Sequence, residues 1–157
     1  MSRAEQLFDV ADRYVSNVLG KDNRHVSAAL QRFKDDRTFL IELFQDDGEI
    51  PILPVMRRYY PEKARFMGRQ ALSNLVRRAR QEARNYDIAT PKGANLLSLL
   101  MFAFGHAVID DPLYPWIKRT LTGNGFAQQN QRIDRLSAKT LTYISAVGNY
   151  FIRADSA

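Results

Sequence analysis

Arginine side chains are the groups of this 157-residue chain with the clearest capacity for chemistry. Nine Lys and Arg residues and two acids lie between positions 57 and 84, which gives this segment a net charge of +7. The remaining residues hold 14 basic and 15 acidic side chains, whereas the whole chain has a net charge of +6. The positive excess is therefore confined to one segment, and it predicts a candidate surface instead of a general attraction for polyanions.

Most of these arginines belong to a helix that we expect from Pro61 to about Tyr86, because proline suits the first helical position. At about 100° per residue, the helix has one broad apolar face. This face consists of Ala64, Met67, Gly68, Ala71, Leu72, Leu75, Val76, Ala79 and Ala83. The opposite face carries a basic ridge, made of Arg69, Ser73, Arg77, Arg80 and Arg84. Arg78 falls at the edge of the apolar face, where we expect partial burial and an acidic partner from another helix.

The residues just before this helix combine arginine with aromatic side chains, as the centres of protein interfaces do. Arg57 and Arg58 directly precede Tyr59 and Tyr60, and we expect the four to extend the basic ridge into one recognition surface. Trp116, the sole tryptophan, is a further candidate anchor, because tryptophan buries a large area on binding. Burial of Trp116 in the core is the alternative.

The basic ridge has three interpretations. Guanidinium groups present planar donors that suit carboxylate and phosphate oxygens, so the ridge fits an acidic protein partner or a nucleic-acid backbone. It also fits a solvated outer face without a partner. The nucleic-acid interpretation lacks a second basic element, interleaved aromatic residues for base stacking and a helix-turn-helix pattern. An acidic protein partner is therefore the favoured ligand of the ridge.

Catalytic and metal-binding patterns are scarce. The chain has two histidines and no cysteine, which excludes disulfides, thiolate nucleophiles and cysteine-based metal sites. His106 and Asp110 are four residues apart and would share one face of a helix. An enzyme or metal site built around this pair is the third candidate function. The acidic pairs at 35–36 and 46–47 lack the spacing of a calcium loop. We expect no catalytic residue, no bound metal and no cofactor.

Apolar residues recur at helical spacing along most of the chain, which predicts an all-α fold. We expect a compact single domain over 1–157, with about six or seven helices around a central apolar helix at 94–109. The segment 38–44 suits either a helix or a strand, and helix is favoured because no second strand is available to pair with it. Two prolines within 50–55 predict an extended or irregular segment. Turns are expected at 46–48 and 123–125.

The N-terminal residues carry acids where a secretory signal would carry basic residues, and the longest apolar run, at 94–109, is too short and too polar to span a membrane. We therefore expect a cytoplasmic protein, although export without such a signal and assembly into a homo-oligomer stay open. The favoured function is that of a non-enzymatic interaction or regulatory protein, of the adaptor, inhibitor or immunity type. Nucleic-acid binding through the same arginines is the alternative.

Overall fold

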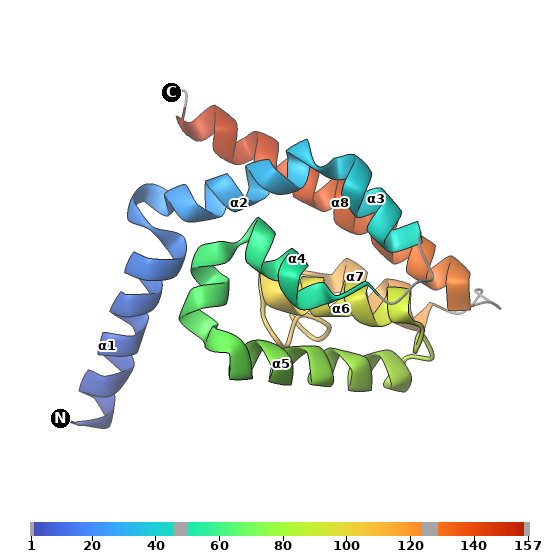
Figure 1. The fold of residues 1–157 in the computed structure, drawn as a ribbon, viewed down its shortest axis with the longest axis horizontal. Coiled ribbons are helices and arrows are strands. Elements are labelled where there is room, and N and C mark those ends of the chain that lie inside the picture. Colours follow the sequence, from blue (N-terminus) through green and yellow to red (C-terminus); the bar gives the residue numbers. More distant parts are fainter. Residues whose placement is uncertain (1, 46–49, 124–128, 156–157) are drawn as a thin grey trace.

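The computed structural model describes residues 2–45, 50–123 and 129–155, and its regular elements are all helical (Figure 1). The elements are α1 (Arg3–Tyr14), a π-helical turn η1 (Val15–Leu19), a 3₁₀ turn η2 (Lys21–Asn23), α2 (Arg24–Asp35), α3 (Arg37–Gln45), α4 (Ile52–Tyr59), α5 (Pro61–Asn85), α6 (Pro91–Phe104), α7 (Pro115–Thr122) and α8 (Gln129–Asp155). The predicted all-α class is confirmed, and the segment 38–44 is helical. The turns expected at 46–48 and 123–125 fall wholly or largely outside the described residues.

Helix α6 forms the centre of the bundle, as its apolar sequence predicts. It contacts α3, α4, α5 and α8, and ten of its residues are buried. The helix begins where the Thr90 side chain accepts a hydrogen bond from the backbone N–H of Gly93. It ends at Phe104, five residues earlier than expected, because Gly105 has a φ of 112° that breaks the helix. His106 therefore lies in a turn and not on the central helix.

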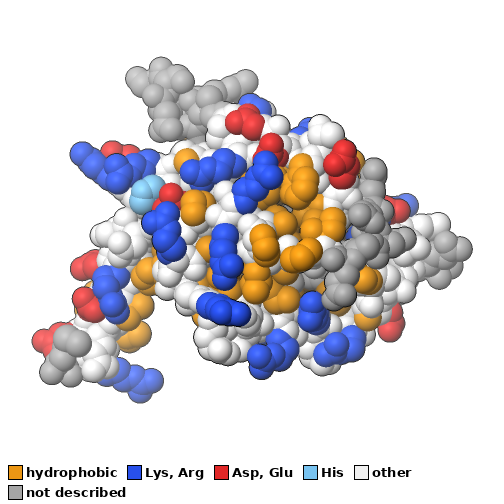
Figure 2. Space-filling view, in the orientation of Figure 1, with side chains coloured by type: hydrophobic (Ala, Val, Ile, Leu, Met, Phe, Trp, Pro, Cys, Tyr) orange, Lys and Arg blue, Asp and Glu red, His pale blue; other side chains and the backbone are white. Residues whose placement is uncertain are grey.

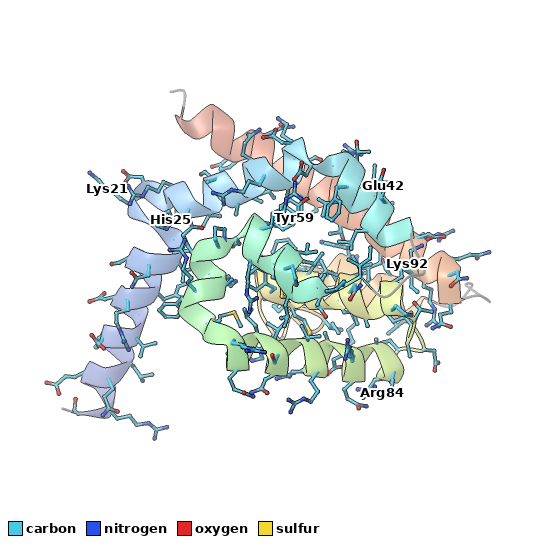
Figure 3. The ribbon with its side chains drawn as sticks, viewed as in Figure 1. Lys21, His25, Glu42, Tyr59, Arg84 and Lys92 are labelled. Carbon is cyan, nitrogen blue, oxygen red and sulfur yellow. The ribbon has the colours of Figure 1, made fainter. Side chains whose placement is uncertain are left out.

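One buried cation is paired within the bundle. Lys92, near the start of α6, is 8% exposed, and its Nζ donates to Asp134 Oδ1 of α8 at 2.6 Å (Figure 3). Pairing offsets the cost of burying an ammonium group. The contact therefore fixes the N-terminal end of α6 against α8.

The segment with two prolines is helical, which corrects the expectation of an extended run over 50–55. Pro51 is the extended residue before α4, and Pro54 occupies its third position. The first turn of a helix has backbone N–H groups without intrahelical partners, so a proline there removes no helical hydrogen bond. The C-terminal part of α4 is anchored by Val55, Met56 and Tyr59, which are all buried.

Helix α5 is interrupted at Gly68, so the expectation of one continuous helix with a single apolar face is wrong. Gly68 has φ 75° and ψ 166°, which separates a first segment from a second that begins at Arg69. Ala71, placed on the apolar face by the wheel, is exposed, whereas Leu72, Leu75 and Val76 are buried. The second segment is continuous and still carries the arginine ridge on one side.

Helix α1 extends away from the bundle and has no buried residue (Figure 1). Its apolar side chains Leu7 and Phe8 are 67% and 72% exposed. Contact with the bundle begins at its C-terminal end, where Tyr14 packs edge-on against Phe66. Within the described ranges, every helix is too short or too polar to cross a bilayer.

Candidate functional site

A groove of about 880 Å³ lies between α4 and α5. One wall is apolar and comes from the two residues before α4 and from its first turn, namely Ile50, Pro51, Ile52, Leu53 and Pro54. The other wall belongs to α5 and consists of Arg69, Ser73, Val76, Arg77 and Arg80, with Arg57 of α4 beside it. On this face of the molecule, basic side chains border an apolar area (Figure 2). We call this site the basic groove.

Three exposed guanidinium groups of the basic groove form no ion pair with an acid of the described residues. Arg57, Arg69 and Arg77 are exposed, and no carboxylate in the described part of the chain forms an ion pair with any of them. Arg80, which lines the same wall, has an interaction of its own. Like charges that line one groove repel each other, and an anion in the groove would relieve that repulsion.

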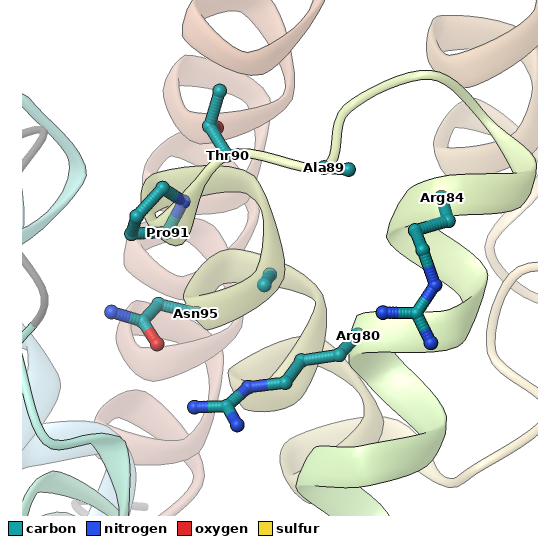
Figure 4. Close-up of a pocket in the computed structure, with 7 residues that line it drawn as sticks. Arg80, Arg84, Ala89, Thr90, Pro91 and Asn95 are labelled. Carbon is teal, nitrogen blue, oxygen red and sulfur yellow. The ribbon is translucent and has the colours of Figure 1, made fainter.

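A smaller hollow of about 270 Å³ continues the basic groove along α5 (Figure 4). Arg80 is common to both hollows, and Arg84 closes the smaller one together with the segment from Ala89 to Pro91. Asn95 of α6 lies at the base, where its side-chain amide donates to the Ile50 carbonyl at 3.1 Å. This hydrogen bond ties the apolar wall of the basic groove to the central helix.

Arg58 does not belong to the basic groove, although the sequence places it beside Arg57. Its guanidinium donates to Asp36 Oδ2 at 2.8 Å and lies 5.5 Å from the centre of the Phe39 ring. Successive residues of a helix point about 100° apart, so Arg57 and Arg58 cannot serve one surface. Arg58 joins α4 to the junction of α2 and α3 instead.

The two tyrosines of the expected recognition surface are buried, so neither is available as a surface anchor. Tyr59 of α4 is fully buried against the α2–α3 pair (Figure 3). Its ring stacks on the Phe33 ring with 4.6 Å between the ring centres, and its hydroxyl donates to Asp36 Oδ2. Burial, followed by the hydrogen bond to Asp36, raises the Tyr59 pKa to about 12. Tyr60 is 7% exposed and donates to the Val18 carbonyl at 2.7 Å. Both residues hold the fold together.

Removing Asp36 tests this structural assignment. We expect Asp36→Ala to lower the free energy of unfolding by about 1–2 kcal/mol, because it leaves the buried Tyr59 hydroxyl without its acceptor and Arg58 without its partner. Urea denaturation measures the change. The neighbouring Asp35 is exposed and accepts a hydrogen bond from Gln31 one turn earlier on the same helix, so Asp35→Ala should change stability by less than about 0.5 kcal/mol. Equal losses in the two variants would contradict the assignment.

Trp116 is half-buried, and its ring centre lies 5.9 Å from that of Tyr143 of α8. Both belong to an aromatic cluster that also contains Phe104 and Tyr114. Its indole N–H is buried and has no hydrogen-bond partner among the described residues. Trp116 does not line the basic groove. An anchoring role beside the ridge is therefore not supported by its position.

The structure does not contain two pairings that the sequence led us to expect, that of His106 with Asp110 and that of Arg78 with an acid. Asp110 accepts a hydrogen bond from Lys118 at 2.6 Å, while His106 is exposed on the turn after α6, so the two do not form one helical face. The described residues contain no group of three or more His, Asp or Glu side chains that could hold a metal ion. Arg78, expected to be partly buried and paired, is exposed, and no acid of the described chain binds it.

Sequence reasoning identified the arginine wall of the basic groove but missed its apolar wall. Arg57, Arg69, Arg77 and Arg80 line the groove, and Arg84 lines its continuation. Pro51, Leu53 and Pro54 carried no functional signal, because a proline-containing segment gives no periodicity from which an exposed face could be assigned. Comparison of the chain with protein-family models, with curated proteins and with solved structures finds no match. Function is therefore argued from the groove itself.

Proposed function

We propose that this chain is a non-enzymatic interaction protein that binds an acidic segment of a partner protein in the basic groove. The observation that carries the proposal is the convergence of Arg57, Arg69 and Arg77 on one groove without acids of the described chain to neutralise them. Carboxylates of the bound protein would pair with these guanidinium groups through charge-assisted hydrogen bonds.

The apolar wall favours a protein segment over a nucleic-acid strand. Pro51, Leu53 and Pro54 offer aliphatic surface opposite the arginines, which suits a segment that alternates acidic and apolar side chains. Among the described residues, none that lines the basic groove is aromatic, so bases would find no ring there on which to stack. The arginines would steer and orient the partner, and the apolar wall would exclude water from the contact.

Charge reversal within the groove tests the proposal against a matched control on the same helix. Arg69→Glu/Arg77→Glu changes two exposed arginines of the groove, while Arg65→Glu/Arg78→Glu changes two exposed arginines of α5 that do not line it. Both double variants alter the net charge equally, so a difference between them reports position and not charge. Each variant is first compared with the wild type by circular dichroism and thermal unfolding.

The defined probe is a fluorescent peptide that alternates glutamate and leucine, followed by anisotropy at low and at physiological salt. We expect the groove variant to bind this peptide at least about tenfold more weakly than the wild type, because two attractive pairs become repulsive. The control variant should change affinity by less than about threefold. Equal weakening in both variants, or no peptide binding by the wild type, would overturn the proposal.

A single-stranded oligonucleotide of mixed sequence provides the competing arm of the experiment. Tighter binding of the oligonucleotide than of the peptide, with the same dependence on Arg69 and Arg77 and a steep loss with salt, would replace the proposed partner class with nucleic acid. Recovery of one protein from a cell extract by the wild type and the control variant, but not by the groove variant, would then identify the partner.

A further inference from the structure

A second cavity, which shares no lining residue with the basic groove, lies where several helices of the bundle meet. It has a volume of about 310 Å³ and is lined by residues of α1, η1, α2, α5, α6 and α8 and of the segments before α5 and α7. Its larger side chains include Tyr14, Leu30, Phe33, Phe104, Tyr114 and Tyr143. The walls are mainly aromatic and aliphatic. Small-molecule sites are typically apolar cavities with a few polar groups that orient the ligand. This cavity lies at the lower end of the usual size range for such sites, about 300–1,000 Å³.

One charged side chain enters this apolar cavity. Lys63, in the first turn of α5, is the one lining residue in the described part of the chain that is cationic or anionic at neutral pH. Its Nζ donates to the Ala103 carbonyl at 3.3 Å and lies 5.9 Å from the Tyr60 ring and 5.7 Å from the Phe102 ring. An ammonium group has three hydrogen-bond donors, and these contacts use one of them.

No carboxylate in the described ranges forms an ion pair with Lys63. The adjacent Glu62 approaches Arg32 at 4.0 Å instead. Lys63 is partly buried, and it is costly to remove an ammonium group from water without a counter-ion, so proteins normally pair such a group. The contrast with Lys92, which is buried and paired with Asp134, shows that this bundle can supply a partner where a lysine is only structural.

We propose that the cavity binds a small hydrophobic carboxylic acid, with its apolar body against the aromatic walls and its carboxylate paired with the Lys63 ammonium. The ligand class follows from the two features together. The walls select an apolar body, and the unpaired cation selects an anionic head group. A medium-chain fatty acid is the simplest molecule with this chemistry, and it is the probe that we choose.

The protonation of Lys63 gives this site a predictable pH dependence. Burial lowers the Lys63 pKa to about 8. The titratable side chains that line the cavity with it are Tyr60 just before α5, Tyr14 from α1, Tyr114 from the segment before α7, and Tyr143 from α8. Glu62 is its neighbour in the sequence. The residues of α2 and α6 that line the cavity carry no titratable side chain.

Burial raises the pKa of Tyr14, Tyr60 and Tyr114 above the ordinary tyrosine value of 10.0. Ionisation of Lys63 therefore accounts for the change in cavity charge between pH 7 and pH 9. Its ammonium form prevails at pH 7 and its neutral amine at pH 9. Carboxylate affinity should fall about tenfold across this range, since the ammonium fraction falls by that factor for a pKa of about 8.

The test compares decanoate, decanol and decylammonium, which share an apolar chain and differ in head-group charge. Fluorescence of Trp116, which lies beside the cavity residue Tyr143, and calorimetry report binding to the full chain below the micelle concentration of each probe. We expect decanoate to bind at least tenfold more tightly than decylammonium at pH 7. Its affinity should fall by about tenfold from pH 7 to pH 9, while decanol affinity should not change.

Substitution of the lysine separates the role of charge from that of the cavity. Lys63→Met should lose at least tenfold in decanoate affinity and keep its decanol affinity, whereas Lys63→Arg should retain a preference for the acid. The groove variant Arg69→Glu/Arg77→Glu should bind decanoate like the wild type. Absence of decanoate binding by the wild type, or equal decanoate affinity in wild type and Lys63→Met, would overturn the proposal. This test is independent of the peptide experiment.

Discussion

Gly93→Ala is expected to lower the free energy of unfolding by about 3 kcal/mol or more, because the added methyl group has no room. A Cβ at position 93 would overlap the Ile88 carbonyl oxygen and would lie 3.2 Å from Ile133 Cδ1. Ile88 is fully buried, and its carbonyl accepts a hydrogen bond from Thr90. Backbone held in this way cannot move aside cheaply, so the start of α6 would have to separate from the preceding loop.

A second glycine offers the matched control for this variant. Gly148 is also buried and helical, but a Cβ there would meet nothing closer than Leu30 at 4.0 Å. Its close approach to α2 therefore does not require glycine. Gly148→Ala should stabilise the protein by about 0.5–1 kcal/mol, because alanine favours helix over glycine by that amount. Urea denaturation followed by circular dichroism measures both, and a neutral Gly93→Ala would contradict the packing described for α6.

Lys63→Met is expected to stabilise the protein by up to about 3 kcal/mol at pH 7. The folded-state pKa of Lys63 is about 8, against an ordinary value of 10.5, and each unit of pKa difference corresponds to about 1.4 kcal/mol. Below pH 8 both the folded and the unfolded chain carry the charge, so the folded state bears the full cost of its burial. Methionine removes that cost and keeps a side chain of similar length.

The sign of the pH dependence follows from proton linkage. Between pH 8 and pH 10.5 the unfolded chain binds the Lys63 proton more tightly than the folded chain, so the wild type gains stability relative to Lys63→Met as pH rises. The advantage of the variant should therefore shrink across this window and vanish near pH 10.5. Raised tyrosine pKa values affect both proteins alike and cancel in the difference.

Lys21→Met serves as the control, because Lys21 is exposed on the turn before α2 and its replacement should change stability by less than about 0.5 kcal/mol at either pH. Urea denaturation of the wild type and both variants at pH 7 and pH 10 provides the six free energies required. An unchanged or lower stability of Lys63→Met at pH 7 would contradict the burial assigned to this side chain. A stable Lys63→Met also ensures that a loss of decanoate binding does not arise from misfolding.

Local sequence patterns predicted the helical class well and the ends of several elements poorly. The apolar run that starts near position 94 predicted the central helix, because a segment apolar on all sides must be covered by others. Its C-terminal end was misplaced, since Gly105 lies within an otherwise apolar pattern and periodicity does not report backbone φ. Pro54 led to the opposite error, since it predicted an irregular segment where a helix forms. A proline in the first turn of a helix removes no hydrogen bond and is therefore tolerated.

The arginine wall of the basic groove could also be predicted from local sequence patterns. Arg69, Arg77 and Arg80 share one side of α5 because they are spaced by helical turns, and that relation needs no tertiary contact. The position of Arg57 beside them, and of Arg58 away from them, depends on how α4 packs against α5 and the α2–α3 pair. That packing joins residues far apart in the chain, so no local pattern encodes it.

The sequence by itself determined the all-α class, the central helix and the concentration of positive charge on one helix, because each depends on residue type and helical spacing alone. Tertiary structure decided the burial of Tyr59 and Tyr60, the apolar wall opposite the arginines, and the separation of His106 from Asp110. It also decided that Lys63 enters an apolar cavity while Lys92 meets an acid. Burial and pairing are set by neighbours from other elements, and these are defined only when the helices pack.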